Sequence, residues 1–543
     1  MTVNDETALT WKRADDEGVR AGARIERKSS AAGWSLGAVW PSNLLLFRVG
    51  AGLFVLPNAI FAINLGLVAA SVILLGCAVS LFVMKRNGDG EVAGLLAAPI
   101  DMSVLAGCAA LGLVLCLLGG EGHIFYTNGD WLIRDAVLAD LVSHGFPIVY
   151  HNENQDFLLR APLGMYMTPA LVGRMLGLRA AHFALLAQNA ALASIILYFA
   201  ARIVNTRKLP FLLLLVAFSG LDIVPVLVRE VQELLSSGNI IGISHIEFWN
   251  RYWWNAFLQY SSHVTLIFWV PNHMLPGWWF ATLALLYVRR EVDLATLAAS
   301  FPVLLIWSPL SMLGAIPFLI LFGVEHLPRK IFERRILIAA AGGLCFIPLA
   351  IYLTIDAAAV PHRFMFAMEG FGTLYAIFLA VELPHAAILA VAWRLIDPRD
   401  RRLVALALAL LVAMPMYEFG VSNDFLMRAS IAPLFLFAFA FSRVATLVPR
   451  DNGRLATCIS VIVILSVATP MMELHRSFAG AYAISDCNFL TSWSKADPTT
   501  WPANYLAPIE KVPAWLVPIG TERVTIEDRR CWPDHPLLEE KRK

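Results

Sequence analysis

The sequence predicts an all-α polytopic membrane protein with about 11–13 transmembrane helices and a small outer C-terminal domain. Composition is the main reason: of 543 residues, 58% are hydrophobic and only 15% are charged. Soluble domains contain about 25% charged residues and roughly 45–50% apolar residues. The mean hydropathy of +0.66 points the same way. Because so few charged side chains would not cover a water-soluble protein of this length, most of the surface is expected to face lipid.

The charge balance excludes one large class of partners. Lys and Arg number 42 against 41 Asp and Glu, which leaves a formal net charge of +1. A chain without an excess of basic residues has no long-range positive field that would attract a nucleic acid. We therefore expect a membrane environment and no nucleic-acid partner.

Many apolar runs approach the length of about 20 residues that a helix needs to cross the hydrocarbon core. Prolines divide two of these runs. Pro309 interrupts the stretch 292–325, which forms either one broken helix or two. Pro271 and Pro276 predict that the run 264–288 is partly re-entrant. The expected spans lie near 42–62, 64–84, 102–120, 180–204, 209–228, 264–288, 292–308, 310–325, 335–354, 371–395, 402–419, 429–447 and 454–473.

The basic residues orient the chain, because short loops rich in Lys and Arg stay on the cytoplasmic side. Every second linker is short and basic if residues 1–33 form a cytoplasmic tail, and this tail lacks the apolar core of a cleavable signal peptide. Residues 34–473 then form the transmembrane domain, with outer loops 121–179 and 229–263, and residues 474–543 form a periplasmic domain. The inner linkers carry Lys85, Arg86, Arg207, Lys208, Arg289, Arg290, Arg329, Lys330, Arg334, Arg335, Arg399, Arg401, Arg402, Arg450 and Arg454.

Two features of the sequence bear on the compartment. No Asn-x-Ser/Thr acceptor site for N-glycosylation occurs, which favours a bacterial inner membrane. Cys487 and Cys531 lie in the predicted periplasmic segment, whereas the other five cysteines lie in apolar spans. An oxidising compartment favours a disulfide between Cys487 and Cys531, and two free thiols are the alternative.

The first outer loop carries the acidic residues that we single out as candidate catalytic groups, Asp130, Asp135 and Asp156. Asn128 is expected to cap a short interfacial helix, and Gly145 followed by Pro147 is expected to end it. An acceptor hydroxyl that must lose its proton needs a carboxylate within hydrogen-bond reach.

The second outer loop and the span after it are rich in aromatic rings, histidine, arginine and proline. Rings stack on sugars or acyl chains, and Arg and His can hold a phosphate. For the Trp residues, an ordinary aromatic belt at the membrane surface is an equally good interpretation. The candidate substrate-binding residues of this region are His245, Glu247, Arg251, His263 and His273.

Ionisable residues in and beside the spans give further candidates. Arg428 follows Asp424 by four residues, so the two either pair on one helix face or leave Arg428 to bind a ligand. Asp222 lies near the outer end of its span and is a candidate substrate-binding residue. Glu382 and His385 flank a proline nearer the middle of the membrane, where they form either a proton relay or a neutral structural pair.

The layout of residues 102–204 resembles the GT-C superfamily of integral-membrane glycosyltransferases. In that family an acidic residue opens an interfacial helix early in a long first outer loop, and a Pro-Leu segment leads into the next span. Here Asp130 matches the acid, and the run from Arg160 to Tyr166 (RAPLGMY) matches that segment. The place of the acid is similar to that in the lipid A aminoarabinose transferase and protein mannosyltransferase branches.

This chain departs from the family in two respects. The family often has two adjacent acids, whereas Trp131 follows Asp130 here, so a second acid must come from Asp135, Asp156 or Asp222. The two spans before the loop also look like an addition to the usual plan. Both departures leave room for a different catalytic acid or for a relative without catalytic activity.

The resemblance implies transfer of a sugar from a polyprenyl-phosphate donor to a lipid, glycan or protein acceptor at the outer face, with inversion. Asp130 would act as the general base, supported by Asp135 or Asp156. Cations would meet the charge that develops on the lipid phosphate. Some relatives look metal-free and others use a divalent ion; no tight His/Asp cluster in the sequence demands one, so no metal ligand is predicted and a divalent metal stays open. The expected cations are Arg251, His263, His273 and Arg428.

Two other functions remain open at this point. A secondary transporter or lipid flippase would use Asp222, Glu382 and His385 as midplane groups, although the sequence shows no inverted repeat. A lipid-glycan ligase or polymerase would share the donor chemistry but depend on Arg and His instead of an acid. In that enzyme His245, Arg251 and His273 would carry the function. A purely structural scaffold does not explain so many polar groups at one face.

Overall fold

The structure, a computed structural model, describes residues 41–85, 94–240, 242–243, 246–247, 257–327, 331–420, 422–448, 453–478, 485, 487–529 and 531. From Ser42 onward the chain forms one compact unit. This unit is mostly helical with few strands, which confirms the all-α class. The predicted cytoplasmic tail, residues 1–33, lies outside the described residues.

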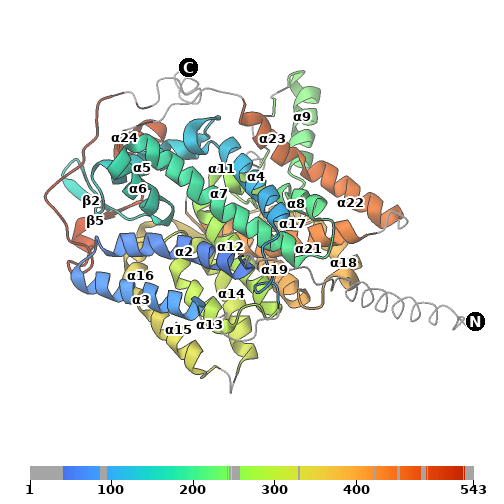
Figure 1. Cartoon of the computed structure of the whole chain (residues 1–543). Helices are drawn as coiled ribbons and strands as arrows, with labels where there is room; N and C mark the ends of the chain where they lie inside the picture. The colour runs from blue at the N-terminus through green and yellow to red at the C-terminus, as the bar shows by residue number, and fades with distance from the viewer. Residues whose placement is uncertain are drawn as a thin grey trace, which may run out of the picture. The chain divides into compact units, whose positions relative to one another are not determined.

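Figure 1 labels the helices in chain order. Those of the first half are α2 (Asn43–Ala62), α3 (Leu67–Lys85), α4 (Met102–Leu118), α5 (Gly129–Ser143), α6 (Gly164–Leu176), α7 (Leu178–Ile203), α8 (Lys208–Val216) and α9 (Ile223–Ser237). Next come α11 (His263–Trp269), α12 (Pro271–Val288), α13 (Leu294–Ser300), α14 (Pro309–Glu325), α15 (Arg334–Leu344) and α16 (Ile347–Thr354). The last are α17 (Phe371–Glu382), α18 (His385–Val391), α19 (Arg401–Ala413), α20 (Asp424–Ala429), α21 (Ile431–Leu447), α22 (Gly453–Ser466), α23 (Ala468–Arg476) and α24 (Phe489–Ala496).

Short strands and 3-10 turns complete the fold. A three-stranded sheet has the order β1-β2-β5, and β3 pairs with β4 in a second sheet. The strands are β1 (Val149–Asn152), β2 (Gln155–Leu159), β3 (His362–Phe364), β4 (Tyr417–Phe419) and β5 (Leu506–Pro508). The 3-10 turns are η2 (Glu121–His123), η3 (Pro302–Leu304), η4 (Ala357–Ala359), η5 (Met365–Ala367), η6 (Trp393–Leu395), η7 (Met414–Met416) and η8 (Ile509–Lys511).

Five helices in the described part of the chain are long and apolar enough to cross a membrane. A sixth candidate consists of α17 and α18, which bend by 64° where Leu383 and Pro384 separate them. These helices are compatible with an all-α membrane protein, and the full number of 11–13 spans stays a prediction. The five are Asn43–Ala62, Leu67–Lys85, Leu178–Ile203, Arg334–Thr354 and Gly453–Arg476; shorter apolar helices cover Met102–Leu118, Leu294–Leu304, Pro309–Glu325 and Ile431–Leu447.

Large apolar side chains are exposed on several of these helices. Leu67 of α3 is 83% exposed and Ile464 of α22 is 68% exposed. Only 22% of the most apolar window of the helix Gly453–Arg476 is buried. Long apolar helices with this little burial are uncommon on a soluble monomer, whereas the hydrocarbon of a bilayer accepts them. These helices are therefore suited to face lipid.

Prolines divide the apolar runs where the sequence predicts. The run 264–288 splits into α11 and α12 at Val270, with Pro271 as the first residue of α12. Pro276 stays inside α12. Pro309 begins α14, and the Ser308 hydroxyl caps this helix by accepting a hydrogen bond from the backbone N–H of Ser311, at 3.1 Å. A proline without an N–H is tolerated in a first helical turn, which explains both starts.

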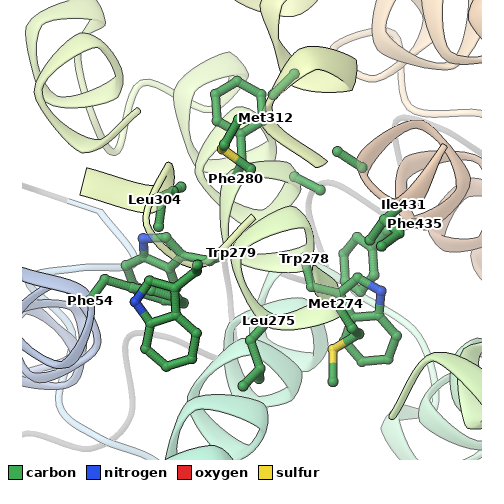
Figure 2. Packing of buried hydrophobic residues seen from close by; sticks show 14 of the residues in the cluster. Phe54, Met274, Leu275, Trp278, Trp279, Phe280, Leu304, Met312, Ile431 and Phe435 are labelled. Carbon is green, nitrogen blue, oxygen red and sulfur yellow. The ribbon is translucent and has the colours of Figure 1, made fainter. Parts of the chain in front are cut away.

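Helix α12 runs through the core and packs against α7, α13, α14 and α21. Figure 2 shows its two adjacent indoles pointing to opposite sides. Trp279 meets Phe54 of α2 with ring centroids 5.7 Å apart, and Trp278 meets Phe435 of α21 at 5.1 Å. Both indoles are buried, and aromatic side chains bury about 150–250 Å² each. These contacts fix the helix whose first turn carries Asn272.

The C-terminal segment belongs to the same compact unit as the first outer loop, and the division at 474 stays a prediction. Strand β5 pairs antiparallel with β2 and places Ala507 opposite Leu158. Helix α24 packs against α5, as Figure 1 shows. The predicted disulfide between Cys487 and Cys531 is present. The C-terminal segment therefore helps to build the surroundings of α5.

Helix α20 lies in very close backbone contact with α14. A Cβ atom added to Gly314 of α14 would stand 1.8 Å from the carbonyl oxygen of Ala429, the last residue of α20. That oxygen belongs to the backbone, so a larger residue at Gly314 would have to displace α20. The absence of a side chain at this position therefore fixes where Asp424 and Arg428 lie.

We expect Gly314→Ala to lower the free energy of unfolding by about 1–3 kcal/mol, because overpacking would push α20 away from α14. The matched control is Gly323→Ala on the same helix, where no atom stands within 4 Å of the added Cβ. That control should be neutral or stabilising by about 0.5–1 kcal/mol, since alanine favours a helix over glycine. Thermal unfolding of the purified protein in detergent measures both changes. Equal midpoints for the two variants would contradict the close contact.

Candidate functional site

The start of α5 is anchored to the end of α11. Because the chain breaks at Val270 before Pro271, the last carbonyls of α11 lack intrahelical partners. The Phe268 carbonyl accepts hydrogen bonds from Asn128 Nδ2 at 2.7 Å and from Trp131 Nε1 at 2.9 Å. Asn128 is also the N-cap of α5 and accepts from the backbone N–H of Asp130 at 3.0 Å, as the sequence predicts. These bonds hold the first turn of α5 in one place.

Asp130 faces a cavity of about 360 Å³ that lies between α5, α11, α20 and the C-terminal segment. The volume falls in the range of about 300–1,000 Å³ that is usual for small-molecule sites. Parts of the chain that are remote in sequence contribute its walls. The lining includes Asp130 and Ile133, then Gln259, Thr265 and Trp269, then Asp424 and Arg428, and finally Trp493, Trp501, Asn504 and Tyr505.

A polar chain leads from Asp130 into the protein interior. Arg134, one turn later on α5, reaches Asp130 Oδ2 at 3.0 Å and Asn272 Oδ1 at 2.6 Å. Asn272 Nδ2 lies 3.3 Å from His273 Nε2, and His273 Nδ1 lies 2.7 Å from the Ser308 hydroxyl. The Asp130 side chain is 41% exposed, whereas that of Arg134 is only 4% exposed. Arg134 therefore orients Asp130 from behind while the carboxylate stays open to the cavity.

Across the cavity, Arg428 is ion-paired with Asp424 of the same helix. The sequence left two alternatives: Arg428 either pairs with Asp424 on one helix face or binds a ligand. The structure contains the ion pair. Asn504 of the C-terminal segment donates from Nδ2 to Asp424 Oδ2 at 3.2 Å. Because the partner carboxylate is held from two sides, the guanidinium of Arg428 has a defined position on the cavity wall.

The C-terminal segment closes the cavity with aromatic rings. Trp493 and Tyr505 have ring centroids 5.8 Å apart, and Trp501 packs on Phe157 of β2 at 4.6 Å. Trp493 Nε1 donates to the Thr500 carbonyl at 2.8 Å, which orients the indole. Burial raises the pKa of the Tyr505 hydroxyl above its ordinary value. Such a wall offers flat apolar faces and few charges.

Buried carboxyl groups lie behind another wall of the cavity. Glu247 accepts hydrogen bonds from Gln259 Nε2 at 2.8 Å and from the Thr265 hydroxyl at 2.9 Å, and both donors line the cavity. Burial, with a contribution from Asp222, raises the pKa of Glu247 well above its ordinary value. The carboxyl groups of Asp222 and Glu382 are also buried and lie near one another, because a Cβ atom added to Gly220 would meet an oxygen of each.

The structure places two predicted catalytic acids away from this cavity. Asp135 lies on a buried face of α5, where His123 Nε2 is 3.3 Å from its Oδ2. Asp156 of β2 is paired with His151 Nδ1 at 2.7 Å and with Arg523 Nε at 2.5 Å. The hydrogen bonds from His151 and Arg523 lower the pKa of Asp156. Both acids are committed to their own partners and do not meet Asp130 in one site, contrary to the prediction that they support it.

The predicted substrate-binding residues divide in a similar way. Arg428 lines the cavity, His273 joins it through Asn272 and Arg134, and Glu247 stands behind it. His263 is fully buried: its Nδ1 lies 2.6 Å from the Leu215 carbonyl, and its ring packs against Trp278 and Phe435. It does not line the cavity, so the geometry gives it no contact with a phosphate there. His245 and Arg251 lie outside the described residues.

Sequence reasoning missed several residues that build the cavity. Arg134 follows Asp130 by one helical turn, and this spacing was a usable signal for an ion pair. Asn272 directly precedes the candidate His273 but was not itself a candidate. No sequence pattern indicated the three aromatic residues of the C-terminal segment, Trp493, Trp501 and Tyr505. Local sequence does not show which aromatic residues of that segment contact an earlier loop.

Comparison with known proteins adds no identification. No family model, curated protein or solved structure matches this chain.

A separate buried acid, Asp140, joins α5 to the C-terminal segment. Its Oδ2 accepts from the Phe489 backbone N–H at 2.8 Å and from the Tyr150 hydroxyl. Burial raises the pKa of Asp140 to about 7 from 3.8. Between these two values the unfolded chain loses its proton while the folded protein keeps it. The contribution of Asp140 to stability therefore declines as pH rises from about 4 to 7.

We expect Asp140→Asn to flatten this pH dependence, because the amide oxygen still accepts both hydrogen bonds and cannot ionise. The change across the window amounts to about 4 kcal/mol at most. The matched control is Asp156→Asn: since the pKa of Asp156 is lowered, its contribution to stability is constant above about pH 4 and is lost as the pH falls below that value. That variant should therefore lower stability by the same amount at every pH from about 4 to 7 and leave the slope in this window unchanged. Unfolding midpoints measured in detergent at several pH values give the slopes. A wild-type slope in Asp140→Asn would contradict the assignment.

Proposed function

We propose that this chain is a GT-C-type membrane glycosyltransferase that transfers a sugar from a polyprenyl-phosphate donor to a lipid, glycan or protein acceptor. In this proposal the chain spans a bacterial inner membrane about 11–13 times, with its N-terminus in the cytoplasm and its C-terminus in the periplasm. The long apolar helices and their exposed apolar side chains support a membrane location. The cavity beside α5 would be the active site at the outer face.

One observation carries the proposal: a carboxylate and a guanidinium from different outer segments, Asp130 and Arg428, line the same cavity. Transfer from a lipid phosphate needs a base for the acceptor and a cation for the leaving group. Asp130 is partly exposed and is oriented by Arg134, as a base requires. The aromatic wall at Trp493, Trp501 and Tyr505 suits the apolar faces of a sugar ring.

The proposed reaction is a single displacement at the anomeric carbon. The acceptor hydroxyl gives its proton to Asp130 as its oxygen forms a bond to that carbon. The bond from the carbon to the phosphate oxygen breaks, and its electron pair leaves with the polyprenyl phosphate. Arg428 stabilises the charge that develops on this phosphate, and attack from the opposite side inverts the configuration. The proton, the new bond and the leaving group are all accounted for in this step without a metal ion.

We expect Asp130→Asn to reduce transfer at least about 100-fold, because a positioned general base contributes roughly 10²–10⁴ in rate. Binding of the polyprenyl phosphate should stay within a few-fold of wild type. The matched control, Asp156→Asn, removes an outer-loop acid that is paired outside the cavity and should retain full activity. Transfer is measured with purified protein and a panel of radiolabelled polyprenyl-phosphate hexoses. Unchanged turnover in Asp130→Asn would exclude it as the base.

A second candidate function, a proton-coupled transporter or lipid flippase, is favoured by a different observation. Asp222 and Glu382 are buried near one another, and Glu382 ends α17 at the break before α18, where the two helices bend by 64°. Broken helices with buried ionisable groups are typical of transporter binding sites. His385 begins α18, but its Nε2 lies 3.4 Å from the Ser466 hydroxyl, and its ring packs at a tilt against Phe218 with centroids 4.5 Å apart.

Glu382→Gln separates the two functions. In a transporter this change should abolish proton-coupled movement in proteoliposomes, because glutamine has nearly the same size as glutamate but cannot gain and lose an acidic proton. Asp130→Asn should then leave transport unchanged. In the glycosyltransferase the effects are reversed: Asp130→Asn abolishes transfer, and Glu382→Gln retains it.

A further inference from the structure

Away from the cavity, two histidines and an aspartate from three different elements converge inside the protein. His123 lies in η2, Asp135 in α5 and His182 in α7. His123 Nε2 lies 3.1 Å from His182 Nδ1 and 3.3 Å from Asp135 Oδ2, and His182 Nδ1 lies 3.8 Å from Asp135 Oδ1. All three side chains are buried. One ligand-type atom from each residue therefore lies within 4.8 Å of the other two.

These distances match the requirements of a small tetrahedral metal centre. Zinc binds imidazole nitrogen and carboxylate oxygen at about 2.0–2.2 Å, so two ligand atoms at a tetrahedral angle stand about 3.3–3.6 Å apart. The two imidazole nitrogens stand 3.1 Å apart, and the Asp135 carboxylate approaches His123 with Oδ2 at 3.3 Å and His182 with Oδ1 at 3.8 Å, so all of these separations are close to this spacing. The two imidazole rings are perpendicular, with centroids 4.4 Å apart, so both nitrogens can point at one centre.

The backbone before α5 has three residues in the left-handed region, and this turn brings His123 close to Asp135 and His182. Gly120 and Gly122 have φ angles of 94° and 76°, and His123 itself has a φ of 56°. A non-glycine residue in the left-handed region is uncommon, and such conformations cluster at ligand-binding sites. This turn presents His123 to His182 on α7 and to Asp135 on α5. The strained turn and the three converging atoms are independent observations.

We propose that His123, Asp135 and His182 bind one divalent transition-metal ion of the zinc class, with water in the fourth position. Two imidazoles and one carboxylate suit zinc, whereas magnesium and calcium prefer sites built from oxygen atoms alone. Asp135 does not line the cavity, so the ion has no place in the proposed transfer. It ties η2, α5 and α7 together, and it fixes the helix that carries Asp130 one and a half turns earlier.

Zinc titration of the chelator-treated protein in detergent tests this proposal without any assay of transfer. Wild type should bind one zinc per chain and unfold at a higher temperature with zinc, but not with magnesium. Asp135→Asn and His182→Gln should each weaken zinc binding at least about 100-fold. The matched control is His144→Gln, which removes the histidine that follows α5 and pairs with Glu522 at the surface. It should bind zinc as wild type does.

Two results would overturn the metal site. The first is that wild type binds no more zinc than the two ligand variants, which would leave a hydrogen-bonded His-Asp-His network without metal. The second is stabilisation by magnesium in preference to zinc, which would contradict the donor set. If a ligand variant fails to fold, the zinc titration of wild type and the comparison of its unfolding temperature with zinc and magnesium still decide the question.

Discussion

The candidate site depends on one backbone oxygen, the carbonyl of Phe268. Pro271 cannot continue α11, so this carbonyl is left without a partner in its own helix. Asn128 and Trp131 supply two donors, and a buried carbonyl left unbonded would cost about 1–3 kcal/mol. A proline in one span thus sets the start of a helix in another segment. The position of Asp130 in the cavity follows from that contact.

Sequence patterns predicted the features that depend on local chemistry. Composition predicted a helical protein suited to lipid, and Pro271 and Pro309 predicted where apolar runs break. The Asn128 cap, the Asp424–Arg428 pair and the Cys487–Cys531 disulfide are all present. Each of these needs only neighbouring residues or a compartment rule, so one sequence is enough to propose it.

Features that depend on the direction of a side chain were not predictable in this way. Asp130 and Asp135 are five residues apart on α5, about one and a half turns, so they leave the helix on opposite sides. Asp130 reaches the cavity, and Asp135 reaches His123 and His182. The pairing of β5 with β2 also joins residues that are about 350 positions apart in the sequence: Leu506 lies opposite Leu159. No local pattern encodes either arrangement.

A structure of the protein in a lipid nanodisc with polyprenyl phosphate bound would test the central claim most directly. We predict that the phosphate lies in the cavity between α5, α20 and the C-terminal segment, within hydrogen-bond distance of the Arg428 guanidinium. The tail of the lipid should leave toward the bilayer. A phosphate bound beside Asp222 and Glu382, or outside the cavity altogether, would contradict the account.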